Sequence, residues 1–95
     1  MTKKIEDIRK ILIVDDLDNY YVYGIDKNKL PIYIETLGVL EGLFNYLKRI
    51  VKDTRLSLDD IFVIDILDYI DSEEEGGASF GNWLSRQVDE KIDVS

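Results

Sequence analysis

The sequence contains neither cysteine nor histidine, and it has a single proline. The two absences exclude disulfide frameworks, thiolate or imidazole metal sites, cysteine nucleophiles and the serine–histidine triad. A bound metal would need oxygen ligands, which favours magnesium, calcium or manganese. No apolar run approaches the roughly 18 residues of a membrane span, and no apolar segment follows Lys3 and Lys4 as in a secretory signal. We therefore expect a cytoplasmic protein that contacts no membrane.

Positive charge is also scarce, because 12 Lys and Arg residues stand against 20 Asp and Glu residues, for a net charge of −8. Carboxylates repel the phosphate backbone, so this excess argues against direct binding to nucleic acid. The chain has 95 residues, of which 45% are hydrophobic and 34% charged, which is typical of one folded domain over residues 1–95. Within it, we expect the acidic, glycine-rich segment 71–78 to form an exposed loop.

Two apolar runs have the composition of buried strands. Ile11–Val14 is continuous and mostly β-branched, and it stops at Asp15 and Asp16, as expected of a strand in a parallel sheet. The second run, Ile61–Ile66, has aspartates at a spacing that would also allow a helix, but its unbroken apolar composition favours a strand. Segments 20–23 and 32–34 are strand-like as well and are predicted to form an antiparallel edge hairpin.

Apolar residues at helical spacing predict a helix from Leu37 to Val51, with Thr36 as its N-cap. Ser79 can cap a last helix whose apolar face comprises Phe80, Trp83, Leu84, Val88 and Ile92. A short helix or turn is expected over residues 3–9. The order of elements predicts an α/β fold with a small, mostly parallel open sheet and two to three packed helices. Right-handed crossovers would place the strands that begin at Ile11 and Ile61 side by side and parallel.

Aspartates follow both of these predicted neighbouring strands. Asp15 and Asp16 end the first strand, and Asp65 ends the second. Sites in open parallel sheets form beyond the carboxyl ends of the strands. Three carboxylates that converge there would recruit a cation, and Mg²⁺ suits such a site. The alternative is that these aspartates are solvated strand ends and helix caps.

The segment Ile11–Asp16 resembles the first strand and acidic pair of response-regulator receiver domains. Phe62–Ile66 resembles their third strand with its phosphoacceptor aspartate, and Gly76, Gly77 and the helix Phe80–Leu84 are similar to the elements that follow it. The likeness is strongest to short receiver-like proteins of bacteria and phages, so the chain resembles a truncated receiver domain. This resemblance implies a receiver or flavodoxin-like strand order 2-1-3, Asp15 and Asp16 as magnesium ligands, and Asp65 as the phosphoacceptor.

No serine, lysine or tyrosine can be assigned a catalytic role. The sequence therefore predicts a non-catalytic regulatory or protein-interaction module with an acidic pocket that binds Mg²⁺. We expect a protein partner with a basic surface, and the predicted contact residues are Asp68, Asp71, Glu73, Glu74, Glu75 and Trp83. One alternative is a small acidic phage or plasmid anti-defence inhibitor that mimics the charge of nucleic acid. Another is a divalent-metal phosphotransfer enzyme.

The predicted strand Ile61–Ile66 also bears on assembly. It is apolar and β-branched, contains no lysine or proline, and has no obvious later strand to cover its outer edge. An exposed edge of this kind tends to pair with another chain. We therefore expect a homodimer, or a partner protein that docks near this strand and the helix of Trp83.

Overall fold

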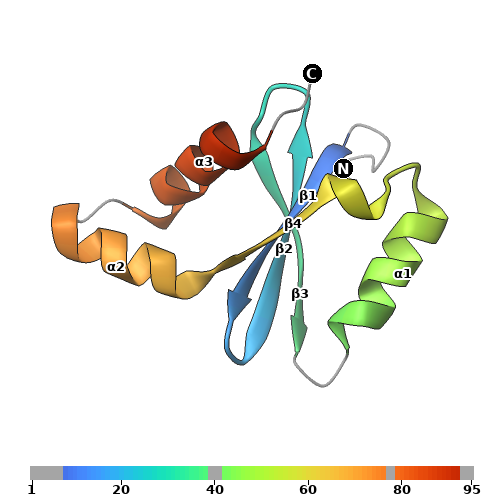
Figure 1. Ribbon diagram of the computed structural model, residues 1–95, viewed down its shortest axis with the longest axis horizontal. Helices are drawn as coiled ribbons and strands as arrows, with labels where there is room; N and C mark the ends of the chain where they lie inside the picture. The colour runs from blue at the N-terminus through green and yellow to red at the C-terminus, as the bar shows by residue number, and fades with distance from the viewer. Residues whose placement is uncertain (1–7, 39–41, 77–78, 93–95) are drawn as a thin grey trace.

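The computed structural model describes residues 8–38, 42–76 and 79–92, with the backbone alone for residues 72–76. The elements follow in the order β1 (Ile8–Asp16), β2 (Asn19–Asp26), β3 (Pro31–Gly38), α1 (Leu43–Asp53), the 3₁₀ turn η3 (Leu58–Asp60), β4 (Ile61–Asp65), α2 (Ile66–Gly76) and α3 (Phe80–Lys91). Helix α1 lies on one side of the four-stranded sheet, and α2 and α3 lie on the other (Figure 1). The sheet is thus the middle layer of three.

The strands are arranged in the order β3-β2-β1-β4. Strands β1, β2 and β3 pair antiparallel, and only β4 is parallel to its neighbour β1. The predicted parallel neighbours are confirmed, since Ile11 is level with Ile61 in this pair. The expected mostly parallel sheet with the order 2-1-3 is wrong, because the chain returns from β1 directly as the antiparallel strand β2.

A tight turn at Leu17 and Asp18 causes this reversal. Leu17 has a φ of 54°, and its backbone N–H donates to the Asp15 carboxylate at 3.1 Å. Two-residue hairpin turns need positive φ and usually carry glycine, asparagine or aspartate at such positions. A leucine there carries no turn signal, so the sequence pattern did not indicate a β1–β2 hairpin.

The second hairpin, between β2 and β3, was predicted and is confirmed. The Asp26 carboxylate holds its turn, because it accepts hydrogen bonds from the backbone N–H groups of Asn28 at 2.8 Å and Leu30 at 3.2 Å. Pro31 is the first residue of β3, which is an edge strand. Proline has no backbone N–H to donate, and it is tolerated at this position because an edge strand pairs on one side only.

The predicted helix from Leu37 with Thr36 as N-cap is wrong at its start. Strand β3 continues through Gly38, where Leu37 pairs with Tyr20 and is buried, and the Thr36 hydroxyl instead lies 2.6 Å from the Tyr33 hydroxyl. Helix α1 begins only at Leu43, after Gly42 with a φ of 82°. The helix or turn predicted over residues 3–9 is wrong at residues 8 and 9, because β1 begins at Ile8. Residues 3–7 of that segment lie outside the described part.

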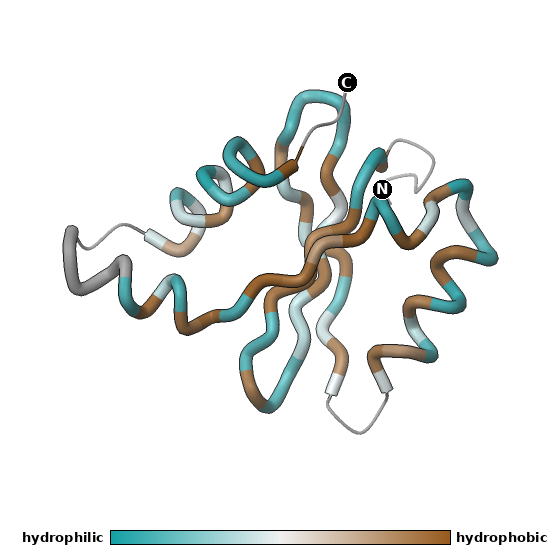
Figure 2. The backbone as a smooth tube through the Cα atoms, viewed as in Figure 1, coloured by the Kyte–Doolittle hydropathy of each residue, from teal (hydrophilic) through white to brown (hydrophobic). Residues whose placement is uncertain are grey.

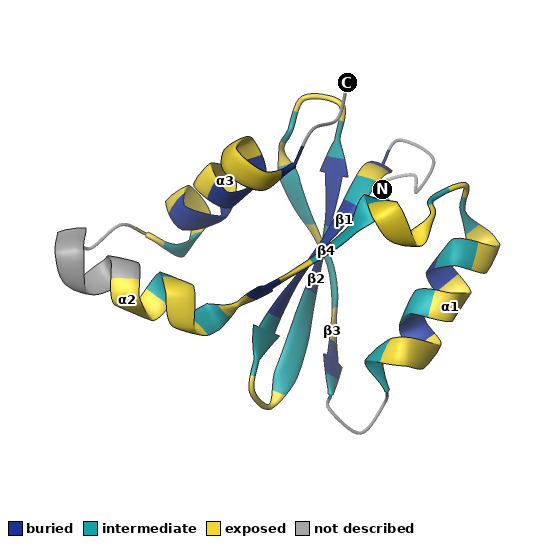
Figure 3. Ribbon diagram, viewed as in Figure 1, coloured by how far each residue is buried: buried dark blue, intermediate teal, exposed yellow. Residues whose placement is uncertain are grey.

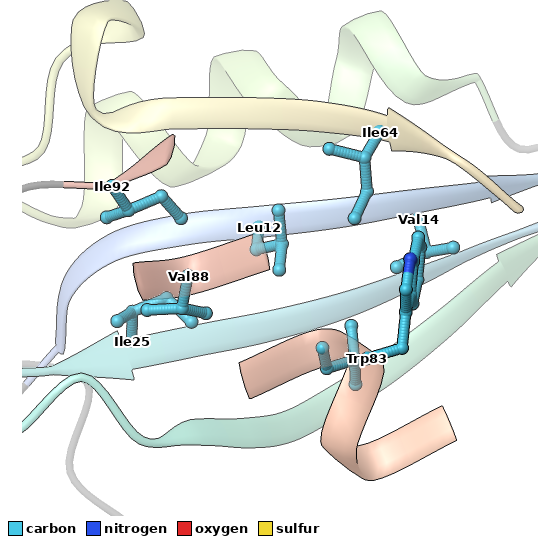
Figure 4. Close-up of a cluster of buried hydrophobic side chains, with 8 residues drawn as sticks. Leu12, Val14, Ile25, Ile64, Trp83, Val88 and Ile92 are labelled. Atoms are coloured by element: carbon cyan, nitrogen blue, oxygen red, sulfur yellow. The ribbon is translucent and has the colours of Figure 1, made fainter. Parts of the chain in front are cut away.

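The alternation of side chains along the strands produces a separate core on each face of the sheet. Leu12 and Val14 of β1 pack toward α3, whereas Ile11 and Ile13 pack toward α1. Figure 4 shows residues of the first cluster, with Trp83 and Val88 of α3 directed at the sheet. The predicted apolar face of α3 is therefore confirmed, as is its N-cap, since Ser79 Oγ accepts from the Asn82 backbone N–H at 3.2 Å.

Helix α2 occupies most of the segment that was expected to be a loop. It continues through Gly76, so the loop prediction is wrong for residues 71–76, while residues 77–78 lie outside the described part. The helix forms because Asp65 Oδ1 accepts from the Leu67 backbone N–H at 2.9 Å, and because Ile66 and Tyr69 pack against the α3-side cluster. Glutamate, which dominates the next turn, is a good helix former.

Candidate functional site

Two of the three predicted metal ligands lie at the same place in the sheet. Asp15 and Asp65 are directly level in the parallel pair of β1 and β4. Both continue the series of residues that faces α1, so their side chains project from the same face. Each already accepts a local backbone hydrogen bond, Asp15 from Leu17 at 3.1 Å and Asp65 from Leu67 at 2.9 Å. One carboxylate oxygen of Asp15 therefore serves the β1–β2 turn, and one of Asp65 serves the start of α2.

The third predicted ligand, Asp16, points to the other face because consecutive strand residues alternate. The Tyr21 hydroxyl donates to Asp16 Oδ2 at 2.7 Å, and this hydrogen bond raises the pKa of Tyr21. Across the described residues, no three Asp or Glu side chains gather in a way that could hold a metal ion. The three-carboxylate set implied by the receiver resemblance does not fit this arrangement, because Asp16 lies on the opposite face of the sheet from Asp15 and Asp65.

The predicted interaction residues separate into a surface group and a core residue. Asp68 and Asp71 are exposed on α2, whereas the side chains of Glu73, Glu74 and Glu75 lie outside the described part. Trp83 is only 1% exposed, and its ring centroid lies 5.4 Å from that of Tyr69. Trp83 therefore stabilises the core and offers no surface to a partner.

The outer edge of β4 is not paired with another strand in the described part of the chain. β4 is the last strand in the order β3-β2-β1-β4, so in the described residues no strand pairs with its second row of backbone groups. Val63, at the centre of the strand, is 51% exposed. The expectation that this apolar strand forms an uncovered edge is thus confirmed for the described part of the chain.

An apolar groove of about 340 Å³ lies between α1 and η3, close to the start of β4. It is lined by Phe44, Leu47, Lys48, Val51, Lys52 and Leu58. Phe44 is 70% exposed and Leu58 65%, and the Lys48 ammonium lies 5.2 Å from the centre of the Phe44 ring. The groove therefore combines an apolar floor with two positive charges. Figure 3 shows the alternation of buried and exposed residues along α1 that leaves this side of the helix uncovered.

Apolar side chains are also exposed just beyond the carboxyl end of β4. Leu67 and Ile70 of α2 are 48% and 44% exposed. Figure 2 shows the hydrophobic colour along β4 and again at intervals along α1 and α2. We refer to the edge of β4, with the exposed Val63 and with Leu58 of the adjoining η3, as the β4 docking surface.

Sequence reasoning missed the groove residues because it used the spacing of the apolar residues only to predict a helix, which does not show which of them face away from the sheet. Tyr46 and Ile50 do lie buried against the sheet, but Phe44 does not. A signal was present in the sequence, since the apolar residues between Leu43 and Val51 cover a wider arc than one core-facing stripe requires.

A second, smaller cavity of about 140 Å³ borders α1 on its sheet side, and its lining includes Glu35, Tyr46 and Arg49. The Tyr46 side chain is buried, and its hydroxyl has no hydrogen-bond partner among the described residues. Burial and the nearby negative charge of Glu35 raise the pKa of Tyr46 to about 12. This hydroxyl is therefore a cost to stability that the fold tolerates.

Comparisons with protein families, curated protein sequences and solved structures find no match to this chain. Among the described helices, none has the length and apolar character that crossing a bilayer requires.

Proposed function

We propose that this protein is a non-catalytic protein-interaction module that engages its partner through the β4 docking surface. The observation that carries this proposal is the uncovered edge of β4, with Val63 half exposed at its centre. Unpaired backbone N–H and C=O groups bind an added strand through main-chain hydrogen bonds, and flanking pockets take up its side chains. The β4 edge supplies the unpaired backbone groups, and the groove beside Phe44 and Leu58 supplies a pocket for side chains.

The distribution of charge separates this proposal from the anti-defence alternative. A mimic of nucleic acid would need a continuous acidic face. On α2, the exposed Asp68 and Asp71 could form only part of such a face. Exposed Lys48, Arg49 and Lys52 on α1 place positive charge beside the same docking surface. Binding to a basic groove would also weaken steeply with added salt, whereas strand addition and apolar contacts are much less sensitive.

Site-specific photo-crosslinking in the natural host tests the proposal. A benzophenone amino acid replaces Val63 in one variant and Leu30 in the control; Leu30 is also exposed, at 56%, but lies in the β2–β3 turn. We expect a covalent adduct of defined mass from position 63 and none from position 30. Equal adducts from both positions, or none from position 63, would overturn the proposal.

A further inference from the structure

We infer that the partner segment at the β4 docking surface is acidic, with an apolar side chain that enters the groove between α1 and η3 and carboxylates beside it that pair with Lys48 and Lys52. This inference rests on the proposed function, because it names the chemistry of the partner of the same surface. The sequence, with its net charge of −8, predicted a partner with a basic surface. At this contact the expected charge of the partner is the opposite one.

The groove and the exposed residue of β4 lie on the same side of the sheet. Val63 is level with Ile13, which packs on the α1 side, and neighbouring residues of paired strands project to one face. Ile61, two residues before Val63, also packs against the α1-side cluster. Leu58, in the turn η3 that directly precedes β4, lines the groove. An extended segment that pairs with the edge of β4 therefore directs every second side chain to the side on which the groove lies.

Two lysines give the groove its charge. The stems of Lys48 and Lys52 belong to an almost wholly apolar lining, which leaves their ammonium groups at the rim. The Lys48 ammonium lies 5.2 Å from the centre of the Phe44 ring, where the negative face of the ring attracts it. Within the described residues neither lysine forms an ion pair, since the pair found there joins Lys10 to Asp60. Both ammonium groups are thus open to carboxylates from another chain.

The distribution of charge favours a narrow acidic segment over an anionic membrane. A bilayer surface is broad, so it would also meet the exposed Asp59 beside Leu58 and the excess of carboxylates that gives the net charge of −8. A single extended segment meets the lysines at the rim directly. Charges beyond about 8 Å are largely screened at physiological ionic strength, so the near lysines outweigh the more distant carboxylates.

NMR titration of the ¹⁵N-labelled protein with three synthetic peptides tests the inference. Each peptide is an acetylated, amidated pentapeptide with a central phenylalanine between two serines, and its terminal residues are both glutamate, both glutamine or both lysine. In an extended segment these terminal residues share a face with the phenylalanine. We expect the amide signals of Phe44, Lys48, Lys52 and Leu58 to shift. The glutamate peptide should bind about fivefold more tightly than the glutamine peptide, and the lysine peptide should bind most weakly.

A matched pair of double variants tests the role of charge. Lys48→Gln combined with Lys52→Gln should abolish the preference for the glutamate peptide. Lys27→Gln combined with Lys29→Gln, in the β2–β3 turn, should keep it, although both double variants lose two positive charges and change the net charge from −8 to −10. Equal binding of the glutamate and glutamine peptides to the wild type would overturn the inference, as would a preference that persists without Lys48 and Lys52.

A second matched pair tests the apolar contact. Leu58→Ser should weaken all three peptides by about fivefold, because the groove loses an apolar wall. Leu30→Ser, at a similarly exposed leucine of the β2–β3 turn, should leave all three affinities unchanged. Equal affinities in both variants would place the peptides outside the groove and overturn the inference.

Other occupants of the groove have their own signatures. Shifts of the Phe44 and Leu58 signals on raising the protein concentration alone would identify a second copy and overturn the inference. Cosedimentation with phosphatidylglycerol vesicles that depends on Lys48 and Lys52, without peptide binding, would identify a membrane and also overturn it. A Val63 crosslink that forms equally without the two lysines would overturn the acidic partner and leave the proposed function standing. Absence of any crosslink from position 63 would overturn the proposed function, and with it the assignment of the groove to that partner, even where the peptides bind.

Discussion

The ammonium group of Lys10 on β1 lies 2.7 Å from the carboxylate of Asp60, the residue directly before β4. Asp60 also accepts a hydrogen bond from the backbone N–H of Ser57 at 3.0 Å, which closes a capping box around η3. These contacts fix the start of the edge strand against its only neighbour in the described sheet. They also hold Leu58 at the mouth of the groove.

Replacing Asp60 with asparagine should therefore destabilise the fold at neutral pH. The hydrogen bond from Lys10, followed by that from Ser57, lowers the pKa of Asp60 below its ordinary value of 3.8. A carboxylate with a lowered folded-state pKa contributes its full stability above that ordinary value and loses it as the pH falls through the lower one. We expect Asp60→Asn to reduce the free energy of unfolding by about 0.5–1 kcal/mol, with allowance for partial exposure. Urea unfolding should show this difference at neutral pH and lose it in strong acid, and Asp59→Asn is the control.

Removing the Tyr46 hydroxyl should not lower the free energy of unfolding at neutral pH, in contrast to Asp60→Asn. Because that buried hydroxyl has no hydrogen-bond partner in the described part of the chain, Tyr46→Phe should leave stability unchanged or raise it at neutral pH. Burial, followed by the charge of Glu35, raises the Tyr46 pKa from 10.0 to about 12, so the tyrosine contributes its full stability below 10.0 and loses it as the pH rises toward 12. Between pH 10 and pH 12 the free energy of unfolding of the wild type should thus fall by roughly 2–3 kcal/mol more than that of Tyr46→Phe. Thermal unfolding between these pH values, with Tyr33→Phe as control, measures the difference, and parallel curves for wild type and variant would contradict it.

Magnesium binding can be tested at the pair of carboxylates that the structure does bring together. Asp15 and Asp65 carry like charges at level positions of neighbouring strands, which is unfavourable without a cation. We expect Asp65→Asn, which keeps an N-cap oxygen for α2, to raise the melting temperature in the absence of metal. Millimolar Mg²⁺ should stabilise the wild type and not this variant.

The position of Asp16 provides the control for that experiment. Asp16 lies on the opposite face of the sheet, so the melting temperature of Asp16→Asn should respond to Mg²⁺ as that of the wild type does. If Mg²⁺ changed none of the melting temperatures, the prediction of a metal pocket at these strand ends would fail. Thermal unfolding is a better readout than Trp83 fluorescence, because Trp83 is buried on the α3 side of the sheet, away from Asp15 and Asp65.

Several features of the fold could be predicted because their signals are local. The continuous apolar runs at Ile11 and Ile61 identified β1 and β4 as parallel neighbours, and Ser79 identified the start of α3. The hairpin at Leu17 could not be predicted, since only tertiary pairing forces a leucine to a positive φ. Leu37 fitted both a helical and a strand pattern, and the pairing of β3 with β2 decided between them.

Some features of the candidate site were predicted from the sequence and others were not. The level positions of Asp15 and Asp65 followed correctly from the parallel pairing of their strands. The inclusion of Asp16 overlooked the alternation of side chains along a strand, which alone assigns it to the other face. The open edge of β4 was predicted because no later segment of the sequence has the pattern of a strand that could cover it. The groove beside it depends on how α1 packs relative to η3, and no local pattern specifies that packing.

Amide hydrogen exchange along β4 tests the central claim most directly. If a partner pairs with the open edge, the outward N–H groups between Ile61 and Asp65 should exchange more slowly in the complex with the protein crosslinked at position 63 than in the free protein. In Val63→Lys, which places a charge on the paired edge, addition of the same partner should leave their exchange rates unchanged. The β2 amides, which are paired on both sides within one chain, should be equally protected with and without the partner. Exchange of the outward β4 amides at the same rate in the free protein and in the complex would contradict the account.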